Sequence, residues 1–366
     1  MQYSYHSFSR RHLFRLGATI GAGALLPQVL NANESTFKLV PNDDHGLADE
    51  TGSQRLSIEK LNQWESLGYG MFIHFSMNTY DGDEFSRGDK PATFYNPDQL
   101  DVDQWIGVAR DSGMKYAILT AKHVPGFCLW PSRHTSYHVG KSGNRTDVVE
   151  AFVKACASKG VLPGLYYCSW DNHHVMGSLT PSMTNFSEAY TTSAYRDFQW
   201  KQLEELASQY GKIAEWWIDI PGVLPRDYRN DLYRFLAEKH PDSLIVMNHG
   251  IGDGSTFKVP YAWPSDVITI ERFLPNSVTK HIKWREIESR KYYLPGEVCD
   301  PIGKEWFYQE GDQPRSDEEL LGMYLICRSR GTNLLLDVPP DKSGLIPKSS
   351  IRSLMQLRKN LDLLHM

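Results

Sequence analysis

Eight short apolar runs, rich in residues that favour β-strands, recur along the 366 residues of this chain. They are residues 68–75, 116–122, 162–168, 213–219, 244–249, 266–271, 292–299 and 333–340. Near-continuous apolar runs are typical of parallel strands that are covered on both faces. Amphipathic helical patterns lie between most of these runs, so the chain is predicted to alternate strands with helices.

The predicted helices lie between the predicted strands or after the last of them. They cover residues 100–110, 147–158, 195–210, 226–239, 317–330 and 349–364, with a weakly patterned one at 284–290. Strands that alternate with helices form right-handed βαβ units, and eight of them close best as a (β/α)8, TIM-like barrel. We therefore expect an α/β fold with a single domain over residues 58–366. The last helix ends the chain, so no C-terminal β-sandwich is expected.

The N-terminus resembles a twin-arginine-type export signal over residues 1–32. Arg10 and Arg11 precede an apolar stretch of small residues at 16–26, and Ala32 offers a cleavage site. The stretch is interrupted by Pro27 and is shorter than the roughly 20 residues that span a bilayer. We expect a periplasmic or secreted protein with no stable membrane insertion after cleavage. Residues 33–57 are polar and are predicted to be a linker.

Composition excludes some functions. The charge balance of 39 basic and 44 acidic residues gives −5, which leaves no basic surface for a phosphate backbone, so nucleic acid is not an expected partner. Five cysteines without CxxC spacing indicate neither a disulfide framework nor a zinc knuckle. Aromatic residues reach 12%, which suits an aromatic cleft, although core packing accounts equally well for many of them.

Barrel enzymes carry their working groups at the carboxyl ends of the strands. The polar residues at those predicted ends are His74, His123, Tyr167, Asp219, Asn248 or His249, Glu271 and Glu297. Glycosidic cleavage requires two carboxyl groups across a pocket. Asp219, which follows Trp216 and Trp217, and Glu271 fit this requirement, whereas the plain alternative is that a strand-end Asp only caps a loop.

Several motifs together resemble the α-L-fucosidases of glycoside hydrolase family 29. They are Gly70-Met71-Phe72-Ile73-His74-Phe75, Leu119-Thr120-Ala121-Lys122-His123, Gly126-Phe127-Cys128-Leu129-Trp130-Pro131-Ser132, Gly164-Leu165-Tyr166-Tyr167, Trp217-Ile218-Asp219, Gly331-Thr332-Asn333-Leu334-Leu335-Leu336, Pro339-Pro340-Asp341 and Gly344-Leu345-Ile346. The resemblance runs from Trp64 to about Leu364. It implies a retaining hydrolase that releases α-L-fucose from fucosylated oligosaccharides or glycoconjugates, with no cofactor and no metal.

The resemblance also implies roles for particular residues. Asp219 corresponds to the nucleophile. Glu271, within Thr269-Ile270-Glu271-Arg272, is the first choice for the acid/base, and Glu297 is the alternative. The sugar hydroxyls would be held by His74, Glu84 and His123, and the flat walls and a phenol would come from Trp130, Tyr167 and Trp217. Strand parity alone decides between Tyr167 and Tyr166, and Phe72 would pack under the sugar's methyl group.

The chain also departs from the family pattern. It has His123-Val124-Pro125-Gly126-Phe127 where the family usually has His-His-Asp-Gly-Phe, so an imidazole and an acid are missing, and it has Asp337 where the family more often has Asn. The loops at 78–80 and 127–132 are similar to the branch that prefers 1,3/1,4-linked fucose.

Other functions are weighed against this one. The missing imidazole leaves open a sugar-binding protein without turnover, or a hydrolase for a related 6-deoxy or galacto-configured α-glycoside. A metal-dependent hydrolase would draw on His74, His123, His173, His174 and His249, but no HxxxH or HxH spacing marks a ligand set. The sequence does not define the linkage, the aglycone or the oligomeric state.

Overall fold

The computed structural model of the chain describes residues 38–39, 52–174, 176, 190–248 and 250–364. The predicted export signal, most of the predicted linker and His249 lie outside these residues. Within them, no helix has the length and apolar character needed to cross a membrane.

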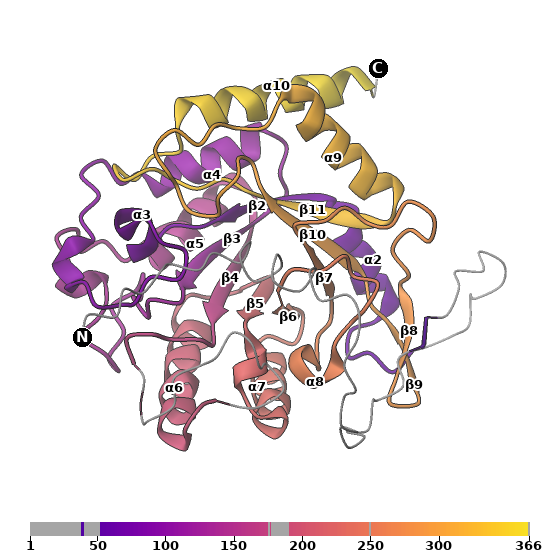
Figure 1. The fold of residues 1–366 in the computed structure, drawn as a ribbon, viewed down its shortest axis with the longest axis horizontal. Helices are drawn as coiled ribbons and strands as arrows, with labels where there is room; N and C mark the ends of the chain where they lie inside the picture. Colours follow the sequence, from indigo (N-terminus) through magenta and orange to yellow (C-terminus); the bar gives the residue numbers. More distant parts are fainter. Residues whose placement is uncertain (1–37, 40–51, 175, 177–189, 249, 365–366) are drawn as a thin grey trace, which may run out of the picture. The chain divides into compact units, whose positions relative to one another are not determined.

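Eight parallel strands form the centre of the fold (Figure 1), and the predicted barrel is confirmed. They are β2 (Tyr69–Ile73), β3 (Tyr116–Lys122), β4 (Leu162–Cys168), β5 (Glu215–Asp219), β6 (Leu244–Asn248), β7 (Ile268–Glu271), β10 (Gly296–Pro301) and β11 (Thr332–Asp337). The ladder runs β6-β5-β4-β3-β2-β11-β10-β7, and its two ends, β6 and β7, lie in contact. The sheet is therefore a nearly closed barrel.

Helices cover the outside of the barrel (Figure 1). They are α2 (Ile58–Leu67), α3 (Met77–Asp81), α4 (Val102–Asp111), α5 (Val148–Lys159), α6 (Ser193–Gln209), α7 (Arg226–Lys239), α8 (Val259–Ala262), α9 (Asp317–Ser329) and α10 (Lys348–Leu364). Capping explains where several of them begin: the Asp147 carboxylate accepts from the Glu150 amide at α5, and Ser316 and Glu319 form a capping box at α9.

The segment predicted as a helix at 284–290 is instead part of a β-hairpin, so that prediction is wrong. β8 (Trp284–Ile287) pairs antiparallel with β9 (Arg290–Tyr293), and β1 (Lys38–Leu39), from the predicted linker, pairs with β8. Glu288 and Ser289 between the strands have φ of 52° and 62°. Two successive left-handed residues are what a tight hairpin turn requires.

The hairpin also changes the seventh predicted strand. The run at 292–299 is divided, because Tyr293 ends β9 and the barrel strand β10 begins only at Gly296 and continues to Pro301. Glu297 is therefore the second residue of its strand. This shift decides where the Glu297 carboxyl group lies.

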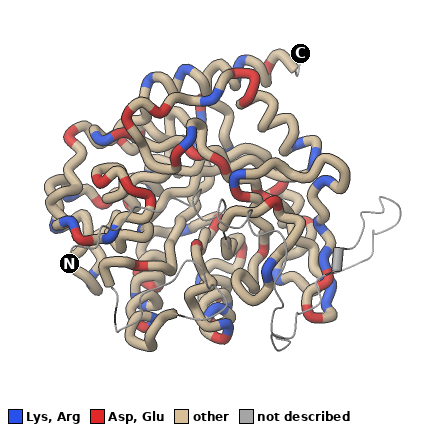
Figure 2. Tube along the Cα trace, viewed as in Figure 1, with Lys and Arg blue, Asp and Glu red and all other residues tan. Residues whose placement is uncertain are grey.

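The charged residues and the cysteines are distributed as the composition suggests. Acidic and basic residues are interspersed along the chain (Figure 2). All five cysteines are buried free thiols.

Candidate active site

Three polar side chains meet at the carboxyl ends of adjacent strands. Asp219 ends β5, Asn248 ends β6 beside it in register, and Glu271 ends β7. Asn248 Nδ2 donates to Asp219 Oδ1 at 2.8 Å and to Glu271 Oε2 at 2.9 Å. Because both oxygens accept from one nitrogen, they lie no more than 5.7 Å apart, the sum of 2.8 and 2.9 Å. The two predicted carboxylates are brought together.

The second oxygen of Asp219 accepts from a phenol. Tyr166 on β4 donates its hydroxyl to Asp219 Oδ2 at 2.7 Å. Burial, and then the charge of Asp219, raise the pKa of Tyr166 well above its usual value, so the phenol stays a neutral donor. Asp219 is 5% exposed and both of its oxygens are hydrogen-bonded. Its position and orientation are therefore fixed from two neighbouring strands.

The predicted place of Tyr167 in the pocket is wrong. Its hydroxyl donates to Gln202 Oε1 on α6 at 2.8 Å, on the helix side of β4. Tyr166 is in register with Trp217, and Trp217 lies on the same face of β5 as Asp219. Paired residues of adjacent strands face the same side, so register places Tyr166 in the barrel and Tyr167 outside it.

Trp130 is also on the helix side. It is 1% exposed and its indole Nε1 donates to Glu205 of α6 at 3.0 Å. This contact contradicts its predicted place in the pocket wall. The motif around Trp130 packs the β3 loop against α6 and does not line the barrel mouth.

Glu297 lies inside the barrel, one layer below the mouth. In β10 the residue level with Glu271 is Cys299, two positions beyond Glu297. The carboxylate of Glu297 accepts from the Tyr116 hydroxyl at 2.7 Å and from the Trp217 indole at 3.0 Å, and the residue has no exposed surface. The predicted placement of Glu297 at the mouth is wrong, because the strand begins later than its apolar run.

A second carboxyl group adjoins Glu297. Glu215, at the start of β5, accepts from the Trp64 indole at 2.9 Å. Burial, and then the charge of Glu297, raise the pKa of Glu215 well above its usual value. Burial also raises the pKa of Glu297 to about 7, although hydrogen bonds from Tyr116 and Trp217 oppose the rise. Burial and the neighbouring carboxylate thus favour the neutral form of Glu215.

The two predicted sugar-binding histidines lie on the other side of the mouth. His74 follows β2 and its Nδ1 is 2.8 Å from Asp337 Oδ1, the same oxygen that accepts from the His74 main-chain amide at 3.2 Å. His123 follows β3 and stacks on Tyr166 at 5.5 Å between ring centroids. The His74 and His123 rings are 5.7 Å apart. Asp337 fixes the His74 ring, leaving its Nε2 for other partners.

Aromatic side chains surround these histidines. Phe72 lies 4.5 Å from His74 and 5.0 Å from Trp217 between centroids. Trp306 and Phe307, in the segment after β10, lie 5.1 and 5.2 Å from His74. The sequence analysis did not identify Trp306 and Phe307, although an aromatic pair after a strand end was a usable signal.

Arg272 connects the Glu271 side of the mouth to that aromatic segment. Its guanidinium lies 4.7 Å from the centre of the Trp306 ring and 3.5 Å from Asp300 Oδ1, and Arg315 lies 3.0 Å from Asp300 Oδ2. Burial raises the pKa of Asp300, and the two arginines oppose that rise. Asp300, rather than Glu297, is thus the carboxylate that β10 presents near its carboxyl end.

Glu84 lies in the segment after α3. It is half-buried, and its main-chain carbonyl accepts from Asn78 Nδ2 at 2.9 Å. The next residue, Phe85, lies 6.5 Å from Trp170 between ring centroids. The segment that carries Glu84 therefore packs beside the one that follows β4.

Val124 and Pro125 stand where the resemblance leads us to expect an imidazole and an acid, and the segment after β4 packs against them. Asn172 donates its main-chain amide to the Val124 carbonyl at 2.8 Å. Asp171 pairs with the buried Lys122 at 2.6 Å and with His174 Nδ1 at 3.0 Å. Burial alone would raise the pKa of Asp171, but Lys122 and His174 outweigh it and lower that pKa. Lys122, Asp171 and His174 therefore form one buried, hydrogen-bonded ion-pair cluster.

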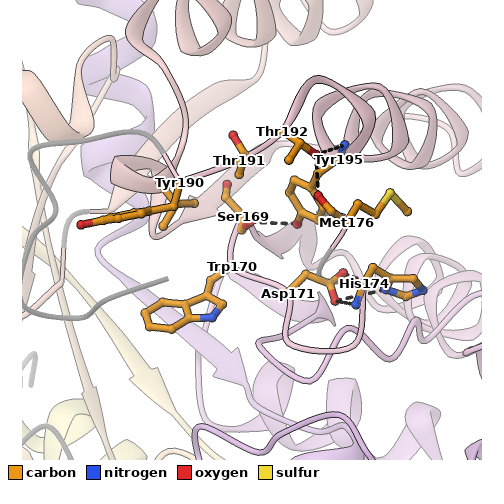
Figure 3. A pocket seen from close by; sticks show the side chains of 10 residues that line it. Ser169, Trp170, Asp171, His174, Met176, Tyr190, Thr191, Thr192 and Tyr195 are labelled. Atoms are coloured by element: carbon orange, nitrogen blue, oxygen red, sulfur yellow. Dashed lines mark hydrogen bonds and ion pairs between the residues drawn. The ribbon is translucent and has the colours of Figure 1, made fainter. Parts of the chain in front are cut away.

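A small pocket lies beside this cluster (Figure 3). It is lined from the β4 end by Ser169, Trp170 and Asp171, from the start of α6 by Thr192 and Tyr195, and by Val223 after β5. The Ser169 amide donates to the Asp219 carbonyl at 2.9 Å, so the pocket adjoins the end of β5.

Within the described residues no cluster of three His, Cys, Asp or Glu could hold a metal ion.

An eight-stranded α/β barrel with two carboxylates held across its mouth defines the class of barrel glycoside hydrolases. The sequence profile described as Alpha-L-fucosidase matches residues 75–363, and the chain belongs to that family.

Similar proteins agree with this assignment. The Arabidopsis thaliana Alpha-L-fucosidase 1 is 31% identical over 312 residues, 80% of this chain and 57% of that protein. The human plasma alpha-L-fucosidase is 26% identical over 80% of this chain and 66% of its own length. A crystal structure of a putative alpha-L-fucosidase from Bacteroides thetaiotaomicron superposes with a TM-score of 0.69 and 30% identity, over 83% of this chain and 67% of that one. The chain spans little more than half the length of its plant relative.

Proposed function

We propose that this chain hydrolyses α-L-fucosides with retention of configuration, releasing α-L-fucose from oligosaccharides or glycoconjugates. The observation that carries the proposal is the shared contact of Asp219 and Glu271 with Asn248, which limits their nearest oxygens to 5.7 Å, from bonds of 2.8 and 2.9 Å. Retaining glycosidases hold their two carboxyl groups about 5 to 5.5 Å apart, whereas inverting ones separate them by about 6.5 to 9.5 Å. The spacing supports retention.

Asp219 is the proposed nucleophile and Glu271 the proposed acid/base. Asp219 forms a bond to the anomeric carbon as the bond to the leaving oxygen breaks, and Glu271 supplies that oxygen with its proton. Water then attacks the anomeric carbon, Glu271 takes a proton from it, and Asp219 is released as a carboxylate. The hydrogen bonds from Tyr166 and Asn248 aim Asp219 before the first step.

The sugar would lie between the carboxylates and the histidines. His74 and His123 would bind its hydroxyls from β2 and β3, and Glu84 would bind from the loop after α3. Trp217 and Phe72, 5.0 Å apart, offer an apolar floor for a methyl group.

The finer assignments belong to the same proposal. The resemblance of segments 78–80 and 127–132 to the branch that prefers 1,3/1,4-linked fucose supports that preference from sequence alone, since Trp130 packs against α6. Residues 1–32 would direct export by a twin-arginine route, which makes the protein periplasmic or secreted, with a fucosylated glycan as its partner.

The test compares substrates with good and poor leaving groups. Nitrophenolate leaves without protonation, so Glu271→Gln is expected to reduce turnover of a fucosylated oligosaccharide by about 10² to 10⁴, and that of nitrophenyl α-L-fucoside much less. Asp219→Asn is expected to lose both activities, and NMR of the first product should show the α-anomer. If Glu271→Gln hydrolyses both substrates normally while Glu297→Gln loses the oligosaccharide, the acid/base assignment is wrong.

Val124 supports a second candidate, a sugar-binding protein without turnover or a hydrolase for a related α-glycoside. Calorimetric binding of fucose and of 6-deoxy and galacto-configured sugars, measured in parallel with release from their nitrophenyl glycosides, separates these outcomes. Binding without release favours a sugar-binding protein without turnover. Release only from another glycoside favours a hydrolase for a related α-glycoside.

A further inference from the structure

The side chain of Asn248 contacts both proposed catalytic carboxylates. An asparagine amide has two N–H donors, and in this site one points to Asp219 Oδ1 and the other to Glu271 Oε2. The residue is 1% exposed, so water has little access to its amide.

The orientation of this amide is fixed by a third contact. Thr269, on β7 two residues before Glu271, donates its hydroxyl to Asn248 Oδ1 at 2.7 Å. An amide turned by 180° would present its oxygen to two carboxylates and its donors to a hydroxyl. The two carboxylates therefore select the orientation in which both hydrogens serve Asp219 and Glu271, and the Thr269 hydroxyl completes it by donating to the amide oxygen.

Two buried carboxyl groups held on one donor also interact through their charges, so ionisation of one disfavours ionisation of the other. In retention one must be ionised for attack while the other is protonated. A donor placed between them, which cannot itself accept at that nitrogen, separates the two protonation states.

We propose that Asn248, whose amide oxygen accepts from Thr269, is a positioning residue for hydrolysis: it sets the spacing of Asp219 and Glu271 and holds them apart, so that one can be ionised while the other keeps its proton. This inference rests on the proposed function. Asn248 does not act on the sugar itself, and its effect is transmitted through the two carboxylates.

The test is the pH profile of kcat/KM on nitrophenyl α-L-fucoside for Asn248→Asp and Thr269→Val. Aspartate has the shape of asparagine but replaces the shared donor with a third carboxyl group. The additional negative charge should hold protons more tightly, so both limbs of the profile should move to higher pH by about one unit, with a loss of about 100-fold at neutral pH. Thr269→Val should lose about 10-fold, since only the orientation of the amide is relaxed.

Asn62→Asp is the matched control, because Asn62 is an exposed residue of α2. It should leave both limbs unmoved, and thermal unfolding should show that every variant is folded. A folded Asn248→Asp whose limbs stay in place, in a chain whose wild type is active, overturns the role of Asn248. An inactive wild type overturns the proposed function instead, which keeps the two failures apart.

Discussion

Replacing Glu215 by glutamine should make the protein more stable at neutral pH. Glu215 and Glu297 are both buried at the amino ends of β5 and β10, and burial together with the charge of Glu297 raises the pKa of Glu215 well above its usual value. Glutamine has the same shape, and its amide can donate to Glu297 while its oxygen accepts from Trp64. The substitution therefore keeps the hydrogen bonds and removes one titrating group.

The magnitude follows from the raised pKa values. A carboxyl group whose pKa is raised on folding keeps a proton that the unfolded chain releases, so stability falls as pH rises through that interval. Glu297 rises from 4.5 to about 7. At 1.36 kcal/mol for each pKa unit, one retained proton costs about 3 kcal/mol between pH 4.5 and pH 7. The pKa of Glu215 is raised in the same direction, so Glu215→Gln should give a gain of that order at pH 7.5 and almost nothing at pH 4.5.

Urea unfolding at several pH values measures the difference. Glu204→Gln on the exposed face of α6 is the control and should change stability little at any pH. Glu297→Gln should destabilise throughout, because an amide nitrogen cannot accept from Tyr116 or Trp217 where a carboxylate oxygen did. A stability difference between Glu215→Gln and wild type that does not change with pH would refute the raised pKa of Glu215.

Three further outcomes are expected. Tyr166→Phe should lower kcat on aryl fucosides by about 10-fold to 100-fold through loss of one donor to Asp219, the proposed nucleophile, whereas Tyr167→Phe should leave kcat unchanged; equal effects would contradict the parity of β4. Lys122→Met should destabilise by about 3 to 5 kcal/mol by leaving Asp171 charged and buried, and a double-mutant cycle with Asp171→Asn should show strong coupling in urea unfolding. A panel of deoxy-fucosides should include one hydroxyl whose removal barely changes KM, because Val124 replaces the imidazole that would have bound it; losses above 10-fold at every position would contradict this.

The barrel could be predicted because its strands are buried on both faces. Runs such as 116–122 and 162–168 coincide with β3 and β4, and the predicted helix at 226–239 is α7. Helix α2 was missed, although Ser57 caps it and Leu61 and Trp64 are its buried side chains. Its apolar residues are too few for periodicity alone to identify it.

The site could be predicted only as far as it depends on strand ends. Asp219, Asn248 and Glu271 each end a strand, so their sequence position was enough to group them. Tyr166 depended on register between β4 and β5, which no single strand encodes. Glu297 depended on where β10 begins, and the apolar run was continuous across the hairpin and the strand.

The two carboxyl pairs of this barrel are connected through one column of aromatic side chains. Trp217 donates to Glu297 below and stacks on Tyr166 at 5.7 Å above, and Tyr166 in turn donates to Asp219. A change in the protonation of the lower pair alters the acceptor of the Trp217 indole, and a shift of that ring is passed to the phenol because the core is close-packed. Glu215→Gln therefore separates two roles of the lower pair: if it only fills the core, stability changes and kcat does not, whereas an effect on the acid limb of kcat would show that the column positions the nucleophile.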